Sequence, residues 1–263
     1  MQTELLDNLP LWGILVGVVV LLCAGLEAGF RLGQWRKRQT PGEKEQVAGA
    51  IVASILGLVA LLLGFTFSLA AQRFDARRMG VLDESNAIGT TWLRTQFLPA
   101  PQQSESARLL REYVDVRVDA VQPGHTAAAI ARSGELQTLL WTQAAQARQT
   151  ADTVSTGLYI QSLNEVIDLH ATRLLALRSR IPLVLWLALY FLSALGMGAV
   201  GFQSGLAAGN RSIMAIALIL AFASVLYLIA DLDRGQEGLL RISQKPMLEL
   251  QQAIKVQVPS AGS

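Results

Sequence analysis

The stretch VAGAIVASILGLVALLLGFTFSLAAQRFDARR, residues 47–78, decides the fold of this chain. Its first part, Val47 to Ala71, contains no charged residue and is long enough, at about 1.5 Å of helix per residue, to cross a hydrocarbon core of about 30 Å. Four charged residues follow without an intervening proline or glycine: Arg73, Asp75, Arg77 and Arg78. The pattern predicts one long helix that crosses a membrane and continues into water.

Three further segments without charge accompany it: 8–26, 181–206 and 212–230. Charged residues make up only 16% of the chain, against about 25% in an average soluble domain. We therefore expect four membrane helices, at about 9–30, 47–71, 181–206 and 212–230. The leader before the first segment contains Glu4 and Asp7, whereas a signal peptide would begin with basic residues, so we interpret this segment as a membrane anchor.

Glycines recur at four-residue spacing in the first span, a pattern that lets another helix approach closely. They are Gly13, Gly17, Gly25, Gly29 and Gly33. The third span contains Gly196-x-Gly198-x-x-Gly201, which matches the dinucleotide-binding fingerprint by letter. That fingerprint needs a strand before it and a helix after it, so helix packing is the better interpretation here.

Residues 72–180 form the one sizeable polar segment, with 12 Arg and 11 Asp or Glu. Their periodicity is that of helices, and strand-like alternation is absent. Four stretches each place residues on one helix face: Val81, Ser85, Ile88 and Trp92; Leu109, Tyr113, Val116 and Ala120; Leu136, Leu140, Gln143 and Ala147; and Leu163, Ile167, His170, Leu174, Leu177 and Ile181. Ser133 is the expected cap of the third, and the fourth should continue directly into the third span.

The expected fold is therefore all-α, with four transmembrane helices and an α-helical extramembrane bundle inserted between the second and third. A short amphipathic helix and a polar tail, within 231–263, complete the chain. The loop 31–46 is rich in Arg and Lys, and the preceding tail has neither. By the positive-inside rule, the N-terminus and the helical segment lie outside.

Catalytic chemistry has little support in the sequence. The chain has no nucleophile motif, no phosphate-binding loop and no paired cysteines, because Cys23 is its single cysteine. His170 is two residues from Asp168, which places the two side chains on different helix faces and favours a packed histidine over a metal ligand. The net charge of +2 does not favour nucleic acid. We expect no enzyme, cofactor or metal site.

Charged residues gather where four spans would end on one side of the membrane. They are Arg73, Asp75, Arg77, Arg78, Asp231, Asp233 and Arg234. Either they fix the depth of the helices and pair across neighbours, or they form an ion vestibule or a latch to the helical segment. Glu27 and Arg31 present a similar choice between an interfacial ion pair and a binding or gating carboxylate.

Several motifs resemble an uncharacterised bacterial membrane family that is called bestrophin-like, and more distantly the bestrophins. The motifs are Phe65-Thr-Phe-Ser-Leu-Ala, Arg73-Phe-Asp-Ala-Arg-Arg, Asp83-Glu-Ser-Asn-Ala-Ile, Glu165-Val-Ile-Asp-Leu-His170 and Asp231-Leu-Asp-Arg234. Bestrophins are four-span pentameric anion channels. The resemblance therefore implies a homo-oligomeric channel in a bacterial inner membrane, with Phe65 and Phe67 as candidates for a hydrophobic constriction.

Two functions are open at this point. One is an oligomeric ion channel, for anions by the resemblance. The other is a membrane-anchored sensor or scaffold that does not conduct, whose helical bundle binds an unknown protein partner. Apart from such a partner, the lipid bilayer and further copies of the chain are the expected contacts.

Overall fold

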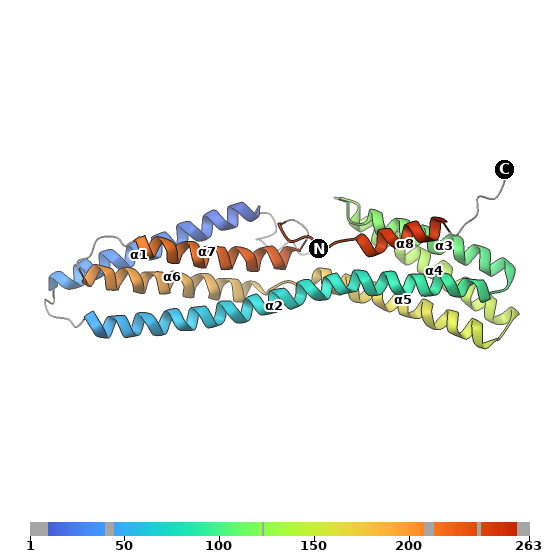
Figure 1. The fold of residues 1–263 in the computed structure, drawn as a ribbon, viewed down its shortest axis with the longest axis horizontal. Helices are drawn as coiled ribbons and strands as arrows, with labels where there is room; N and C mark the ends of the chain where they lie inside the picture. The colour runs from blue at the N-terminus through green and yellow to red at the C-terminus, as the bar shows by residue number, and fades with distance from the viewer. Residues whose placement is uncertain (1–9, 40–44, 123, 208–212, 236–237, 257–263) are drawn as a thin grey trace. The chain divides into compact units, whose positions relative to one another are not determined.

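The computed structural model describes residues 10–39, 45–122, 124–207, 213–235 and 238–256, and every regular element in these ranges is a helix (Figure 1). The helices are α1 (Leu11–Gln39), α2 (Glu45–Arg94), the 3₁₀ helix η1 (Thr95–Phe97), α3 (Ala100–Asp119), α4 (Thr126–Thr150), α5 (Val154–Arg178), α6 (Leu183–Leu206), α7 (Ile213–Arg234) and α8 (Lys245–Val256). The all-α prediction is confirmed.

The long helix predicted over 47–78 is α2, which extends further than expected and has 50 residues. No proline occurs between Gln46 and Leu98, so no backbone N–H of the helical ladder is missing. The helix ends through η1 just before Pro99, and Leu98 has the extended conformation that a residue before proline prefers (φ −83°, ψ 155°).

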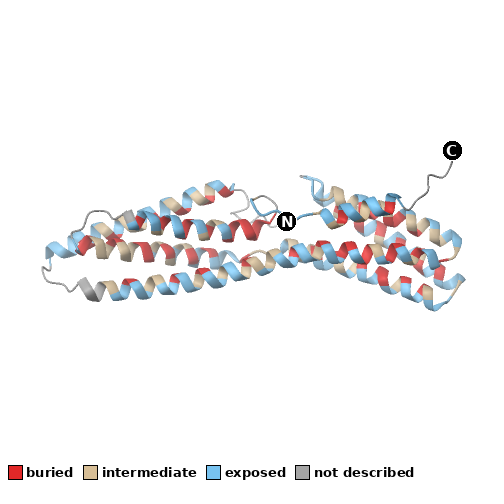
Figure 2. Cartoon of the chain, in the orientation of Figure 1, coloured by how far each residue is buried: buried red, intermediate tan, exposed pale blue. Residues whose placement is uncertain are grey.

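The chain divides into two compact units, each with its own hydrophobic core. The first unit consists of Met1–Phe74 and Arg180–Arg241, and the second of Asp75–Ser179 and Ile242–Ser263. Figure 2 shows the buried positions as stripes along single helices. Such stripes are what amphipathic helices produce when one side of each helix packs against its neighbours.

Close packing of α1 on α6 organises the first unit. A Cβ added at Gly29 would lie 1.9 Å from the carbonyl oxygen of Gly198, and one at Gly201 would lie 2.0 Å from that of Leu26. Gly25 and Gly33 make similar approaches to α6, and contacts advance in the same direction along both helices, which are therefore parallel. The predicted packing role is confirmed for these glycines. Gly17 meets nothing within 4 Å.

Four described helical segments are long and apolar enough to cross a membrane. They include α1, the first part of α2, α6 and α7. Their shared core contains Leu22, Met197, Leu226 and Ile229, each at most 1% exposed. The N-terminal residues 1–9 and the connections at 40–44 and 208–212 lie outside the described ranges.

The second unit packs α3, α4, α5 and α8 with the last part of α2. Tyr113, Leu136 and Leu163 are fully buried in its core, as the predicted helix faces require. The C-terminal helix α8 contributes Met247 and Ile254 to this core and lies against α3. The amphipathic C-terminal helix thus belongs to the second unit by packing.

Two details of the prediction are wrong. The stripe from Leu163 to Ile181 does not continue as one helix, because α5 ends at Arg178 and α6 begins at Leu183. Pro182 lacks an N–H and disfavours the helical conformation at the preceding residue, so the chain is extended between the two helices.

Ser133 does not cap a helix. It lies buried inside α4, which begins seven residues earlier, at Thr126. Gly124, with φ +86°, provides the turn that precedes the helix. The helix periodicity located the apolar face but not the helix start, because the Ala-rich sequence before Ser133 favours helix as well.

Candidate functional site

A buried ion cluster lies at the centre of the second unit and is built around Glu84 of α2. Arg117 of α3 donates from Nε to Glu84 Oε1 (2.9 Å) and from Nη2 to Oε2 (3.2 Å). Arg173 of α5 donates from Nη1 to Oε2 (2.5 Å), and the Tyr113 hydroxyl donates to Oε1 (3.2 Å). Glu84 is 0% exposed. We call Glu84, Tyr113, Arg117, His170 and Arg173 the Glu84 cluster.

The Glu84 cluster links α2, α3 and α5, and it bonds to side chains of α4 and of the segment before α8. Gln137 of α4 donates to the hydroxyl of Tyr113 (3.2 Å). Arg173 donates from Nη2 to Oε1 of Gln244 (2.9 Å), immediately before α8. Each buried charge is thus paired, which is the condition under which charged groups are tolerated inside a protein. The cluster fixes the relative positions of α2, α3 and α5.

Electrostatics keep Glu84 ionised. Burial alone raises the pKa of its carboxyl, but His170 and the guanidinium groups of Arg117 and Arg173 lower it by more, so the pKa lies well below its ordinary range. Burial and the Glu84 charge together raise the pKa of Tyr113. Burial lowers the pKa of Arg173 despite its carboxylate partner. The ionised carboxylate is therefore required to balance two buried cations.

His170 is a packed histidine, as its position in the helix stripe predicts. It is buried, its Nδ1 lies 3.6 Å from Glu84 Oε1, and its ring meets the ring of Tyr113 edge to face at 6.2 Å. Among the described residues, no group of three or more His, Cys, Asp and Glu side chains is placed to hold a metal ion.

The charged candidates of α2 that lie in the second unit are Asp75, Arg77 and Arg78. Arg77 is buried, and it donates to the carbonyl oxygens of Ala176 (3.2 Å) and Ser179 (3.1 Å) at the end of α5. These acceptors belong to carbonyls that a helix end leaves without intrahelical partners. Asp75 and Arg78 are exposed.

The candidates at the end of α7 are buried in the first unit. Asp231 accepts hydrogen bonds from the backbone N–H groups of Leu239 (3.1 Å) and Leu240 (3.2 Å). Asp233 accepts from the N–H of Ile181 (3.0 Å), and Arg180 donates to the Asp233 carbonyl oxygen (2.6 Å). Asp233 therefore holds the segment before α6, and Asp231 holds the segment after α7. Arg234 is buried as well.

Phe65, Phe67 and Arg73 lie on the part of α2 that belongs to the first unit. Phe65 is 66% exposed and Phe67 is 40% exposed, while Arg73 is half-buried. Residues two apart in a helix differ by about 200° around its axis, so the two phenylalanines point to different sides of α2.

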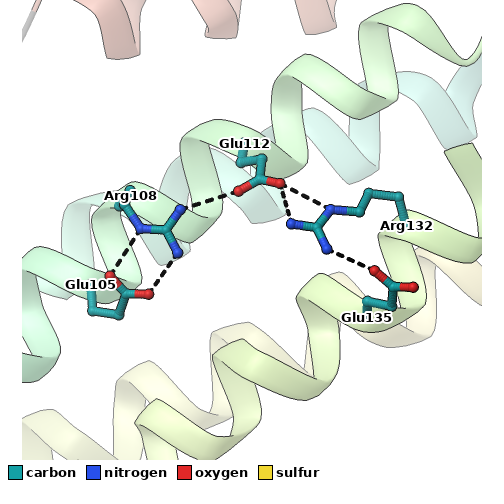
Figure 3. A network of polar contacts seen from close by, with 5 residues as sticks. All are labelled: Glu105, Arg108, Glu112, Arg132 and Glu135. Carbon is teal, nitrogen blue, oxygen red and sulfur yellow. Dashed lines mark hydrogen bonds and ion pairs between the residues drawn. The ribbon is translucent and has the colours of Figure 1, made fainter.

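A surface network of five residues connects α3 and α4 (Figure 3). Arg108 bonds Glu105 and Glu112, and Arg132 bonds Glu112 and Glu135. A hollow beside it contains Asp115, Asp119 and His125. Its acidic groups are already paired, for example Asp119 Oδ2 with His125 Nδ1 (2.7 Å). Because these groups lie at the surface and are partly exposed to solvent, each pair adds little to stability.

Sequence reasoning missed Glu84 as a central residue, although two signals pointed to it. It lies three residues after Val81 and four before Ile88, on the buried face of α2. It also lies in the Asp83-Glu-Ser-Asn motif that carries the family resemblance. A charged residue on an apolar face needs a partner, and Arg117 and Arg173 lie too far along the chain for local spacing to identify them.

Comparisons with known proteins agree with this architecture. The profile of the bestrophin-like domain family matches residues 18–247. A single-substitution variant of a bacterial bestrophin homologue from Klebsiella pneumoniae has a TM-score of 0.70 at 14% identity, covering 91% of this chain and 97% of that one. The Klebsiella pneumoniae homologue solved by zinc phasing has a TM-score of 0.67 at 16% identity, covering 94% and 98%.

A structure described as a variant of a membrane protein has a TM-score of 0.64 at 15% identity, with coverage of 94% and 98%. No curated protein matches the chain. At these identities the structural likeness is one of fold, and the family match extends over most of the sequence. The chain is a helical membrane protein, and it belongs to the bestrophin-like domain family.

Proposed function

We propose that the protein is an oligomeric ion channel in which the exposed face of α2 lines the conduction path. The observation that supports this is the position of Gly57 and Gly64, where an added Cβ would meet nothing within 4 Å. Ser54 and Ser68 lie on the same side of α2 and are exposed. Unlike Gly29 and Gly201, neither of these two glycines approaches another helix closely within the described part of the chain.

Phe65 is the proposed constriction. It is the more exposed of the two phenylalanines, and around the helix axis it lies about 20° from Ser54 and about 60° from Ser68, whereas Phe67 lies nearer the buried side of α2. A ring of Phe65 side chains from several copies would form an apolar neck that gates by dewetting. Phe67 would then contact lipid or the adjacent copy.

The charged candidates divide by their surroundings. Arg77, Asp231 and Asp233 are buried and bonded to backbone groups, so we assign them to holding the structure. Asp75 and Arg78 are exposed on α2, and we propose that they tune ion selectivity. By analogy with bestrophins we propose anions as the conducted ions, a pentamer as the assembly, and the second unit as extramembrane.

Two measurements test the channel proposal, beginning with the particle mass in mild detergent. A closed ring is expected, since cyclic symmetry brings one α2 from each copy around a common axis. Chloride flux into liposomes should then rise for Phe65→Ala, because removing the apolar neck lowers the barrier to wetting. Phe67→Ala is the matched control and should change flux much less.

A monomeric particle, or liposomes that contain the inserted protein and conduct no ions, would refute the channel. The sensor or scaffold function would then be favoured. Its supporting observation is an exposed apolar group in the second unit at the start of α5 and in η1: Val154, Leu158 and Phe97. Pull-down with the full chain, compared with a Val154→Asp variant, would then identify whether these residues bind a partner.

A further inference from the structure

Helix α1 is longer than a membrane span requires. Its 29 residues extend over about 43 Å, against about 30 Å of hydrocarbon core. The uncharged sequence ends before Glu27, Arg31 follows one turn later, and the last turns contain Arg36, Lys37 and Arg38. All four cations are exposed. The basic end of α1 therefore lies at the depth of the lipid headgroups when the apolar part occupies the bilayer.

One face of the basic end of α1 carries a tryptophan between two arginines. Arg31, Trp35 and Arg38 follow at spacings of four and three residues, so they share a face of α1. The side chain of Arg31 is 77% exposed and Trp35 is 54% exposed. Gly33, which packs on α6, lies about 200° around the helix from Arg31. We call Arg31, Trp35 and Arg38 the headgroup stripe. It faces away from α6.

We propose that the headgroup stripe binds the phosphate of an anionic phospholipid. Arg31 and Arg38 lie about one helical turn before and after Trp35, and guanidinium groups bind phosphate through charge-assisted hydrogen bonds. Tryptophan is enriched at the membrane interface, which is the depth of the lipid phosphate. Leu32 beside them is exposed and apolar, as a position against acyl chains would be. Because the headgroup stripe directly continues an apolar membrane helix, a lipid is favoured over a soluble anion as its ligand.

Glu27 is built into the same site as a competitor. Its Oε1 accepts a hydrogen bond from Arg31 Nε at 2.9 Å, four residues along α1. A guanidinium has five N–H donors, and this contact engages one of them. The carboxylate thus orients Arg31 and also reduces the local positive charge. Removing it should strengthen phosphate binding.

The test uses the full chain in mild detergent, with native mass spectrometry to count bound phosphatidylglycerol or phosphatidylcholine. The wild-type chain should retain phosphatidylglycerol in preference to phosphatidylcholine. Arg31→Gln with Arg38→Gln should weaken phosphatidylglycerol binding by about 30-fold, from the usual attraction of two cations at an anionic surface. Glu27→Gln should strengthen it several-fold, a gain that misfolding would not produce.

The matched control is Arg108→Gln with Arg148→Gln, which removes the same charge from exposed positions of the second unit. It should bind phosphatidylglycerol as the wild-type chain does. Equal retention of both lipids by the wild-type chain would overturn the proposal, as would an equal loss in the control pair. Displacement of the lipid by inorganic phosphate would overturn the lipid assignment.

Discussion

Glu84 is the residue whose loss should cost the second unit most. Glu84→Gln removes the negative charge that two buried guanidinium groups share, and uncompensated buried charge costs about 3–5 kcal/mol. We expect a large decrease in the free energy of unfolding, measured by chemical denaturation in mild detergent. Glu105→Gln is the control, since its pair with Arg108 is exposed, and it should change stability by less than about 0.5 kcal/mol.

The same residue should give the protein an acid-sensitive stability. The pKa of Glu84 is lowered in the folded chain from its ordinary value of 4.5, so its contribution is fully present above that pH and is lost as the pH falls below it. Wild-type stability should therefore decrease steeply on acidification below about pH 4.5, and that of Glu84→Gln less steeply. Identical slopes for the two chains would show that the carboxylate is not stabilised by its neighbours.

At the residue scale, the sequence predicted which side chains are buried better than it predicted which groups they bond to. Helix spacing placed His170 on a buried face, and the structure confirms it. The partners of Glu84 could not be predicted, because they come from α3 and α5 and meet only when those helices pack. The same holds for Asp231, whose partners are backbone groups of a segment without periodicity.

At the element scale, the α1–α6 pair depends on atoms that glycine lacks. Gly29→Ala would place a methyl group 1.9 Å from the Gly198 carbonyl oxygen, so the helices must separate, at a cost of about 1–3 kcal/mol. The thermal midpoint in detergent should fall. Gly17→Ala in the same helix meets open space and should leave the midpoint unchanged or raise it slightly. A similar decrease for both variants would contradict the packing role.

Helices could be predicted where a long run of apolar residues is not interrupted by proline, as in α2. The four-residue glycine spacing predicted a close helix contact, but not that α6 would be the partner or that the pair is parallel. The apolar stripe that ends at Ile181 favoured a helix continuous with the third span, although Pro182 follows it. The restriction that proline places on Ile181 decided the outcome.

At the scale of the whole molecule, the inserted helical segment has a core of its own, in line with its length of about 110 residues. The sequence did not predict that the C-terminal helix α8 would complete that core. Met247 and Ile254 gain their burial from residues more than a hundred positions earlier, a non-local pairing that periodicity within α8 does not reveal.

Two separate cores should give additive responses to substitution. Gly29 contacts only first-unit residues in the described structure, and the Glu84 cluster consists of second-unit residues. Gly29→Ala combined with Glu84→Gln should therefore lose the sum of the two single losses, within about 0.5 kcal/mol. Hydrogen exchange in mild detergent gives the location of each effect. It should rise in α1 and α6 for Gly29→Ala, and in α3, α4 and α5 for Glu84→Gln. Faster exchange in α1 and α6 of the Glu84→Gln chain, or a double loss that departs from the sum by more than about 1 kcal/mol, would show that the units unfold as one.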